Sequence, residues 1–232
     1  GEIVGIAGID GNGQSELVEA LTGLRKCHSG SIKINGHEIV NNTPKQIFKK
    51  GIKNIPEDRH KRGLVLDFTV AENSILQNYK DARFSKNSII NKDAMDKHAK
   101  SIISRFDVRP TDYTQKTRAL SGGNQQKAIV AREIDRNTDL LIAVQPTRGL
   151  DVGAIENIHS RLVELRDADK AVLLVSLELD EVMSLSDRIL VMHKGEIVGE
   201  FNPKEVTAQE LGLYMAGAKK QNINKVGNNN EW

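Results

Sequence analysis

The chain has 232 residues, a formal net charge of +2 at pH 7 and 38% hydrophobic residues. Its length suits one α/β domain with a helical lobe and is sufficient to bury a substantial core. Because Lys and Arg do not cluster into a stripe, we predict no nucleic-acid partner, and the charge does not require an anionic membrane.

Cysteine and histidine usage exclude further classes of protein. Cys27 is the only cysteine, so we expect no disulfide framework and no multi-thiolate metal site, and a reducing cytoplasm fits best. The six histidines lack metal-ligand spacing, and we assign no zinc site. The sequence has no signal-peptide pattern and no apolar run near the ~20 residues of a membrane helix. Any membrane role is expected to depend on a partner.

The N-terminal segment has the element order of a phosphate-binding unit. Residues 1–7 predict a strand, a glycine-rich loop follows over 8–15, and a helical pattern comes next. The loop matches G-x-x-x-x-G-K-[ST] except at the lysine, which is Gln14 and carries no charge. In isolation, such a loop can also be an ordinary tight connection. The predicted nucleotide-binding residues are Gly8, Asp10, Gly11, Asn12, Gly13, Gln14, Ser15 and Glu16, with Ser15 as a weak Mg²⁺ ligand.

The rest of the chain alternates between strand and helix patterns. An Asn35-Gly36 turn predicts a hairpin within 31–39. Further strands are predicted from apolar runs, and helical patterns separate them, which predicts an α/β fold with a mostly parallel sheet. The strands are expected at 51–56, 140–144, 172–176 and 189–192, the helices mainly over 70–120 and at 128–134, and a disordered tail at 221–232.

A second motif, Leu120-Ser121-Gly122-Gly123-Asn124-Gln125-Gln126-Lys127, begins a predicted helix. Ser-Gly-Gly at a helix start offers one hydroxyl and several unpaired N–H groups to an anion. The alternative is a plain helix cap. The buried strand that ends at Val144 follows, and then comes Gln145-Pro146-Thr147-Arg148-Gly149-Leu150-Asp151.

In this order the motifs resemble an ABC-type nucleotide-binding domain over residues 2–217. Residues 121–127 resemble the ABC signature, and 145–151 resemble the segment from Walker B to the D-loop. Together with 55–59 they look like the C-terminal nucleotide-binding half of fused, two-domain ATPases of bacterial simple-sugar and nucleoside importers, closest to the nucleoside branch. The resemblance implies a P-loop NTPase fold of ABC type, with a mostly parallel sheet core, an N-terminally truncated antiparallel part and a helical subdomain.

The resemblance also locates departures from a hydrolytic ABC site. The metal-holding acid corresponds to Val144, and the carboxylate that polarises water corresponds to Gln145, which cannot accept a proton. The switch-histidine position is Leu177, and the glutamine position facing the γ-phosphate is Glu57. Losing one preorganised donor can cost about 10²–10³ in rate. We therefore predict an impaired site and assign no catalytic residue.

Because ABC domains pair head to tail, the resemblance implies that this chain completes the phosphate site of a partner domain. The expected partners are the N-terminal nucleotide-binding domain of the same polypeptide, transmembrane permease subunits and, indirectly, an extracellular substrate-binding lipoprotein. ATP and Mg²⁺ are the implied cofactors, weakly bound here, and the implied location is the cytoplasmic face of the plasma membrane. The residues expected at the shared site are Ser121, Gly122, Gly123, Asn124 and Gln125, with Asp151 of the D-loop bridging the interface.

The expected domain covers residues 1–220, with a core over 1–69 and 128–217 and a helical subdomain over about 70–127. Family members begin earlier, with an aromatic residue that stacks on adenine. This chain begins on the phosphate-loop strand, so we expect weak ATP binding that lacks roughly 1 kcal/mol of stacking.

Several alternatives stay open from the sequence. The same role in a simple-sugar importer is one, and a non-enzymatic ATP-sensing or scaffolding domain is another. A soluble ABC protein of translation or DNA repair is a third, against which the weak net charge counts. The charged run 58–62 is typical of a solvated loop. Alternatively, an Arg or Lys of this run compensates for the missing phosphate-loop lysine.

Overall fold

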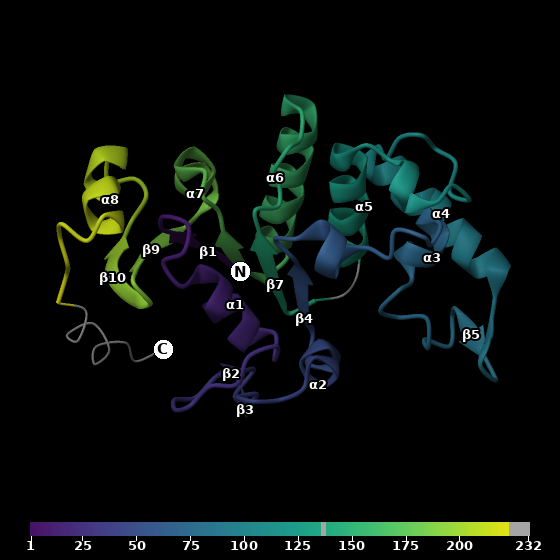
Figure 1. Ribbon diagram of the computed structural model, residues 1–232, viewed down its shortest axis with the longest axis horizontal. Helices are drawn as coiled ribbons and strands as arrows, with labels where there is room; N and C mark the ends of the chain where they lie inside the picture. Colours follow the sequence, from purple (N-terminus) through teal and green to yellow (C-terminus); the bar gives the residue numbers. More distant parts are fainter. Residues whose placement is uncertain (136–137, 223–232) are drawn as a thin grey trace. The chain divides into compact units, whose positions relative to one another are not determined.

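The computed structural model describes residues 1–135 and 138–222, which divide into two compact units (Figure 1). The core unit comprises Gly1–Asn54, Thr138–Gln145 and the chain from Leu162 onward, and the helical unit comprises Ile55–Asn137 and Pro146–Arg161. The bounds predicted for the helical subdomain stay a prediction. Gln221, the first residue of the predicted tail, donates its backbone N–H to the carbonyl of Val198 at 2.8 Å, and disorder of the tail stays a prediction. The rest of the predicted tail, 223–232, lies outside the described residues.

The core unit contains a six-stranded sheet in the order β10-β9-β1-β8-β7-β4. Neighbouring strands β9, β1, β8 and β7 pair in parallel, and β10 is antiparallel to β9. The predicted mostly parallel sheet is therefore confirmed. The strands are β1 (Glu2–Ala7), β4 (Ile52–Ile55), β7 (Leu140–Val144), β8 (Ala171–Val175), β9 (Arg188–His193) and β10 (Glu196–Phe201).

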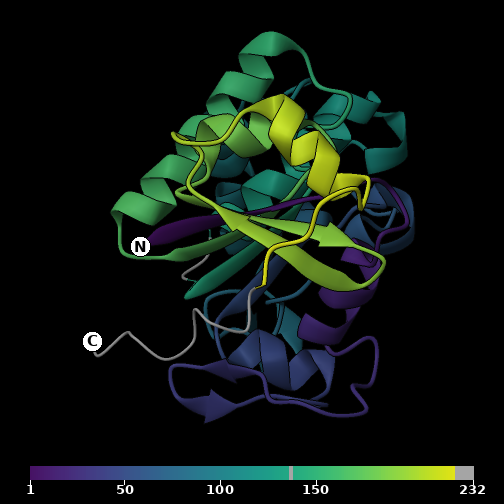
Figure 2. The ribbon, with the colours of Figure 1, turned by 90° about the vertical axis from the view of Figure 1, so that its left-hand side faces the viewer.

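Both faces of this sheet are covered by helices, because alternate strand residues point to opposite sides. On one face, Met192 of β9 belongs to a buried cluster with Val18 of α1 (Gln14–Leu21) and Ile47 of α2 (Pro44–Lys49). On the other face, the neighbouring Val191 clusters with Val182 of α7 (Leu179–Leu185) and Leu211 of α8 (Ala208–Met215). Figure 2 shows α1 and α2 below the sheet and α7 and α8 above it.

The predicted hairpin forms a small separate sheet of β2 (Lys33–Ile34) and β3 (His37–Glu38). Its turn residues Asn35 and Gly36 have φ values of 49° and 75°. Such left-handed positions suit Asn-Gly, so the residue pair determines the turn.

The helical unit is less regular than its sequence predicts. Residues 70–120 contain a hairpin, β5 (Ser85–Lys86) and β6 (Ile89–Ile90), where a mainly helical segment was expected. Its turn places Asn87 and Ser88 at positive φ without a glycine, so the usual signal is missing. No helix in the described residues has the length and apolar character needed to cross a membrane. The other elements are η1 (Arg59–Gly63), α3 (Val70–Ser74), α4 (Lys92–Phe106), η2 (Thr117–Ala119), α5 (Gly122–Ile134) and the start of α6 (Val152–Asp167).

Candidate functional site

The glycine-rich loop connects β1 to α1, as a phosphate-binding unit requires. Gly13 precedes α1 with φ 111°, and Gly11 has φ 81°. A Cβ on Gly8 would lie 2.4 Å from Nε2 of Gln14 and 3.0 Å from the carbonyl oxygen of Met192, so a larger residue there would displace the Gln14 side chain. Asp10, Ser15 and Glu16 are exposed around the loop.

Gln14, which replaces the lysine of the motif, is turned inward. The side chain is only 7% exposed, and its Nε2 donates a hydrogen bond to the carbonyl oxygen of Ile9 at 3.1 Å. The amide therefore closes the loop on itself and brings no positive charge to an anion.

Asn12 fixes the tip of the loop to distant parts of the core unit. Its carbonyl accepts from the backbone N–H of Gly195 at 2.7 Å, and its Oδ1 accepts from that of Lys194 at 3.2 Å. Its Nδ2 donates to the carbonyl of Met215 at 3.4 Å. Sequence reasoning missed this anchor, since more than 180 residues separate its two sides.

The other altered positions of the core unit follow neighbouring parallel strands. Val144 ends β7 and pairs with Val175, the last residue of β8. Gln145 has φ 44° and donates its backbone N–H to the carbonyl of Val175 at 2.7 Å. Leu177 is exposed just beyond β8. Because carboxyl ends of parallel strands share one edge, the loop, Gln145 and Leu177 lie at the same edge of the sheet. Glu57 is exposed in the helical unit.

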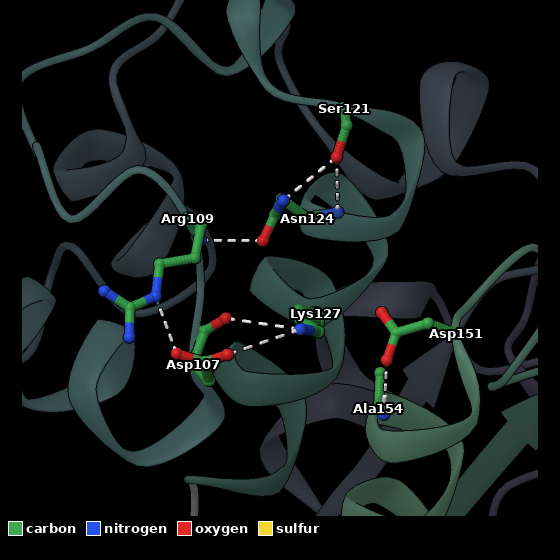
Figure 3. Close-up of polar contacts among 7 residues, drawn as sticks. All are labelled: Asp107, Arg109, Ser121, Asn124, Lys127, Asp151 and Ala154. Carbon is green, nitrogen blue, oxygen red and sulfur yellow. Dashed lines mark hydrogen bonds and ion pairs between the residues drawn. The ribbon is translucent and has the colours of Figure 1, made fainter.

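The signature motif caps α5 (Figure 3). Ser121 is the cap residue, and its Oγ accepts a hydrogen bond from the backbone N–H of Asn124 at 3.4 Å. Nδ2 of Asn124 also donates to this Oγ at 2.9 Å, while its Oδ1 accepts from the backbone N–H of Arg109 at 2.7 Å. Ser121 therefore does cap the helix, as the alternative interpretation of the motif expects. Capping by Ser121 still leaves the N-terminal end of this 13-residue helix able to favour an anion.

Gln125 is largely buried at the start of α5, and its expected role at a partner's phosphate stays a prediction. It is 5% exposed, its Nε2 donates to the carbonyl of Thr117 at 3.0 Å, and its Oε1 lies 2.8 Å from Nε2 of His60. We assign Gln125 the role of holding the start of α5 in place.

A charged cluster flanks the signature helix (Figure 3). Lys127 of α5 donates to the carbonyl of Asp107 at 3.3 Å, and the carboxylate of Asp107 accepts from Nε of Arg109 at 2.7 Å. Together with Asp151 and the start of α6, Asp107 and Lys127 line a cavity of about 270 Å³. Sequence reasoning missed this cluster, because its members come from separate segments.

Asp151 occupies the start of α6. Its Oδ1 accepts a hydrogen bond from the backbone N–H of Ala154 at 2.9 Å. This bond, helped by the charge of Lys127, holds the pKa of the Asp151 carboxyl below its usual range. The exposed carboxylate is ionised at neutral pH and caps the helix.

The chain has the P-loop ABC ATPase fold. Its mostly parallel sheet leads from the first strand into a glycine-rich loop and a helix, and a second helix is capped by Ser-Gly-Gly. The family model described as ABC transporter matches residues 1–148. This chain belongs to that family. Among solved structures, a dimeric ATP-binding cassette in a post-hydrolysis state with ADP and inorganic phosphate is similar in fold. The TM-score is 0.74 at 24% identity, over 88% of this chain and 87% of that one.

Curated relatives carry the names of import proteins. The guanosine import ATP-binding protein NupO of Bacillus subtilis is 60% identical over 225 residues, which are 97% of this chain and 44% of that protein. The nucleoside import ATP-binding protein NupA of Lactococcus lactis is 55% identical with the same coverage. The glucose import ATP-binding protein TsgD13 of Haloferax volcanii is 42% identical over 94% of this chain and 40% of that protein. This chain thus spans less than half the length of these relatives.

Proposed function

We propose that this chain is one nucleotide-binding domain of a two-domain importer ATPase. In this proposal it supplies the signature for the ATP site of the other domain, while its own ATP site hydrolyses poorly or not at all. The observation that carries the proposal is the contrast between two surfaces. The signature end of α5 is open to an anion, whereas the phosphate loop is closed on itself by Gln14.

The chain's own site lacks the groups that hydrolysis needs. Val144 and Gln145 stand where the strand end would supply a metal-holding acid and a general base, and neither side chain carries a charge. Weak binding of Mg²⁺ and ATP is still compatible with Ser15 and with the backbone N–H groups of the loop.

The second half of the site is assigned to another domain of the same polypeptide. The relatives NupO and NupA are more than twice as long as the matched segment, which supports a polypeptide with room for a second nucleotide-binding domain. We place this chain as the C-terminal half on its motifs. The test is whether the signature variant Gly122→Asp removes ATPase activity from the complete assembly.

The proposed partners follow from the same relatives. NupO and NupA carry nucleoside import in their names at 60% and 55% identity, against 42% for the glucose import protein. We therefore favour nucleosides over sugars as the transported class. Permease subunits and an extracellular binding lipoprotein are the corresponding partners, and they place the domain on the cytoplasmic face of the membrane.

A groove on the helical unit is suited to a permease. It has a volume of about 420 Å³ and is lined mainly by apolar side chains, including Phe68, Ile75, Leu76 and Tyr79. Phe68 is 41% exposed. Large exposed aromatic side chains around a groove favour the docking of an amphipathic helix. We assign the groove to a cytoplasmic helix of the permease.

We expect Phe68→Glu in the two-domain protein to abolish co-purification with the permease, because it removes an exposed aromatic side chain and puts a charge into a mainly apolar groove that docking would desolvate. The matched control is Leu213→Glu on α8, where the side chain is similarly exposed at 44% and lies outside the groove. The measurement is pull-down of the permease with tagged ATPase. Retention of the permease by the Phe68→Glu variant would contradict the assigned docking surface.

A further inference from the structure

The guanidinium group of Arg59 lies directly against the signature motif. A Cβ on Gly122 would be 2.8 Å from Nη2 and 3.2 Å from Cζ of Arg59. Gly122 is the first residue of α5, and Ser121 caps it. The glycine therefore provides the space in which the guanidinium approaches the start of the helix.

Three contacts fix the turn that carries Arg59 onto α5. His60 contacts Gln125 at 2.8 Å at one end of the turn. At the other end, Nη1 of the buried Arg132 donates to the carbonyl of Gly63 at 2.9 Å. Gly63 also lies so close to Ile129 that a Cβ would be 2.5 Å from Cδ1. The position of Arg59 is thus set by the helix that it faces.

The charge of Arg59 is not neutralised by its surroundings. Within residues 1–135 and 138–222, the guanidinium of Arg59 donates no hydrogen bond and forms no ion pair. The adjacent Asp58 accepts instead from the backbone N–H groups of His60 and Lys61. The half-buried guanidinium lies beside the positive end of a helix, and both groups favour an anion.

We propose that Arg59 is a further nucleotide-contacting residue of the signature surface. Its guanidinium binds the outermost phosphate of a nucleoside triphosphate that is held in the phosphate loop of another ABC domain. The inference rests on the proposed function, in which this signature faces that phosphate. A guanidinium presents paired donors that match phosphate oxygens. An arginine supplied in trans can stabilise the charge that develops during phosphoryl transfer.

The test uses the complete two-domain protein with its permease, and compares Arg59→Gln, Arg59→Lys and the control Lys61→Gln. Lys61 lies in the same turn, is exposed and carries the same charge. We expect Arg59→Gln to lower kcat/KM for ATP by about 10²-fold. Arg59→Lys should recover part of this loss, because it keeps the charge without the paired donors. Lys61→Gln should behave as wild type.

Two further readouts separate phosphate contact from structural support. The midpoint of thermal unfolding should be unchanged in Arg59→Gln, and the inhibition constant for ADP should be unchanged because ADP lacks the outermost phosphate. Normal ATPase in Arg59→Gln, with loss of activity in Gly122→Asp, would overturn this inference and leave the proposed function standing. Normal ATPase in Gly122→Asp would overturn the proposed function itself. Equal weakening of ADP and ATP, or lower thermal stability, would assign Arg59 a structural role and also overturn the inference.

Discussion

We expect ATP hydrolysis by the complete two-domain protein to fall by at least about 10²-fold when Gly122 is replaced by Asp. The new carboxylate would stand at the start of α5, where the signature is proposed to meet a phosphate, and like charges repel. It would also pair with Arg59, whose guanidinium lies 2.8 Å from the position of the new Cβ. Since the end of this side chain is flexible, the fold should accommodate the change.

The matched control is Gly212→Asp in α8. This glycine is also helical, and a Cβ on it meets nothing within 4 Å. Phosphate release by the assembly with permease is the measurement, and the control should retain wild-type activity. Wild-type activity in Gly122→Asp would mean that this signature serves no ATP site.

The second large effect concerns stability. Arg132 is 2% exposed and Glu133 is 0% exposed, and Nε of Arg132 donates to Oε1 of Glu133 at 2.7 Å. Arg132 also holds the carbonyl of Gly63. We expect Arg132→Met to lower the free energy of unfolding by about 3–5 kcal/mol, because it leaves the carboxylate of Glu133 buried without this partner.

Chemical denaturation of this chain measures the free energy of unfolding, and two further variants serve as comparisons. Arg25→Met breaks the ion pair of Arg25 with Glu19, in which the Arg25 side chain is exposed, and should change stability little. The double variant Arg132→Met/Glu133→Gln should recover part of the loss, because neither charge of this buried pair is left. If Arg132→Met unfolds at the same denaturant concentration as Arg25→Met, the buried pair does not support the helical unit.

The class of fold could be predicted from the sequence because its signals are local. The spacing of Gly8, Gly13 and Ser15 determines a turn and a helix start within eight residues. The apolar run 140–144 predicts a buried strand by itself. Asn35-Gly36 specifies a hairpin turn by its backbone preference. The hairpin at Asn87-Ser88 was not predicted, because neither turn residue is the glycine that such turns usually contain.

The details of the site depend on contacts between distant segments, which no spacing rule reveals. The contact of Gln125 with His60, for example, joins residues 65 positions apart, and the signature motif gives no sign of it. Likewise, the charged run 58–62 is mostly exposed, as expected of a solvated loop, but its sequence does not reveal that Arg59 lies against Gly122. The proposed departures at Val144, Gln145 and Leu177 could be located from the sequence because the resemblance to ABC domains aligns each of these positions with a motif residue.

The most direct test of the central claim is calorimetric titration of ATP into this chain, with and without Mg²⁺, together with a phosphate-release assay. With an inward-turned Gln14 and no acid at the end of β7, we predict a Kd no tighter than about 1 mM, equivalent to roughly 4 kcal/mol, and no release of phosphate. Tight Mg²⁺-dependent binding with turnover that disappears on changing Ser15 would contradict a silent site.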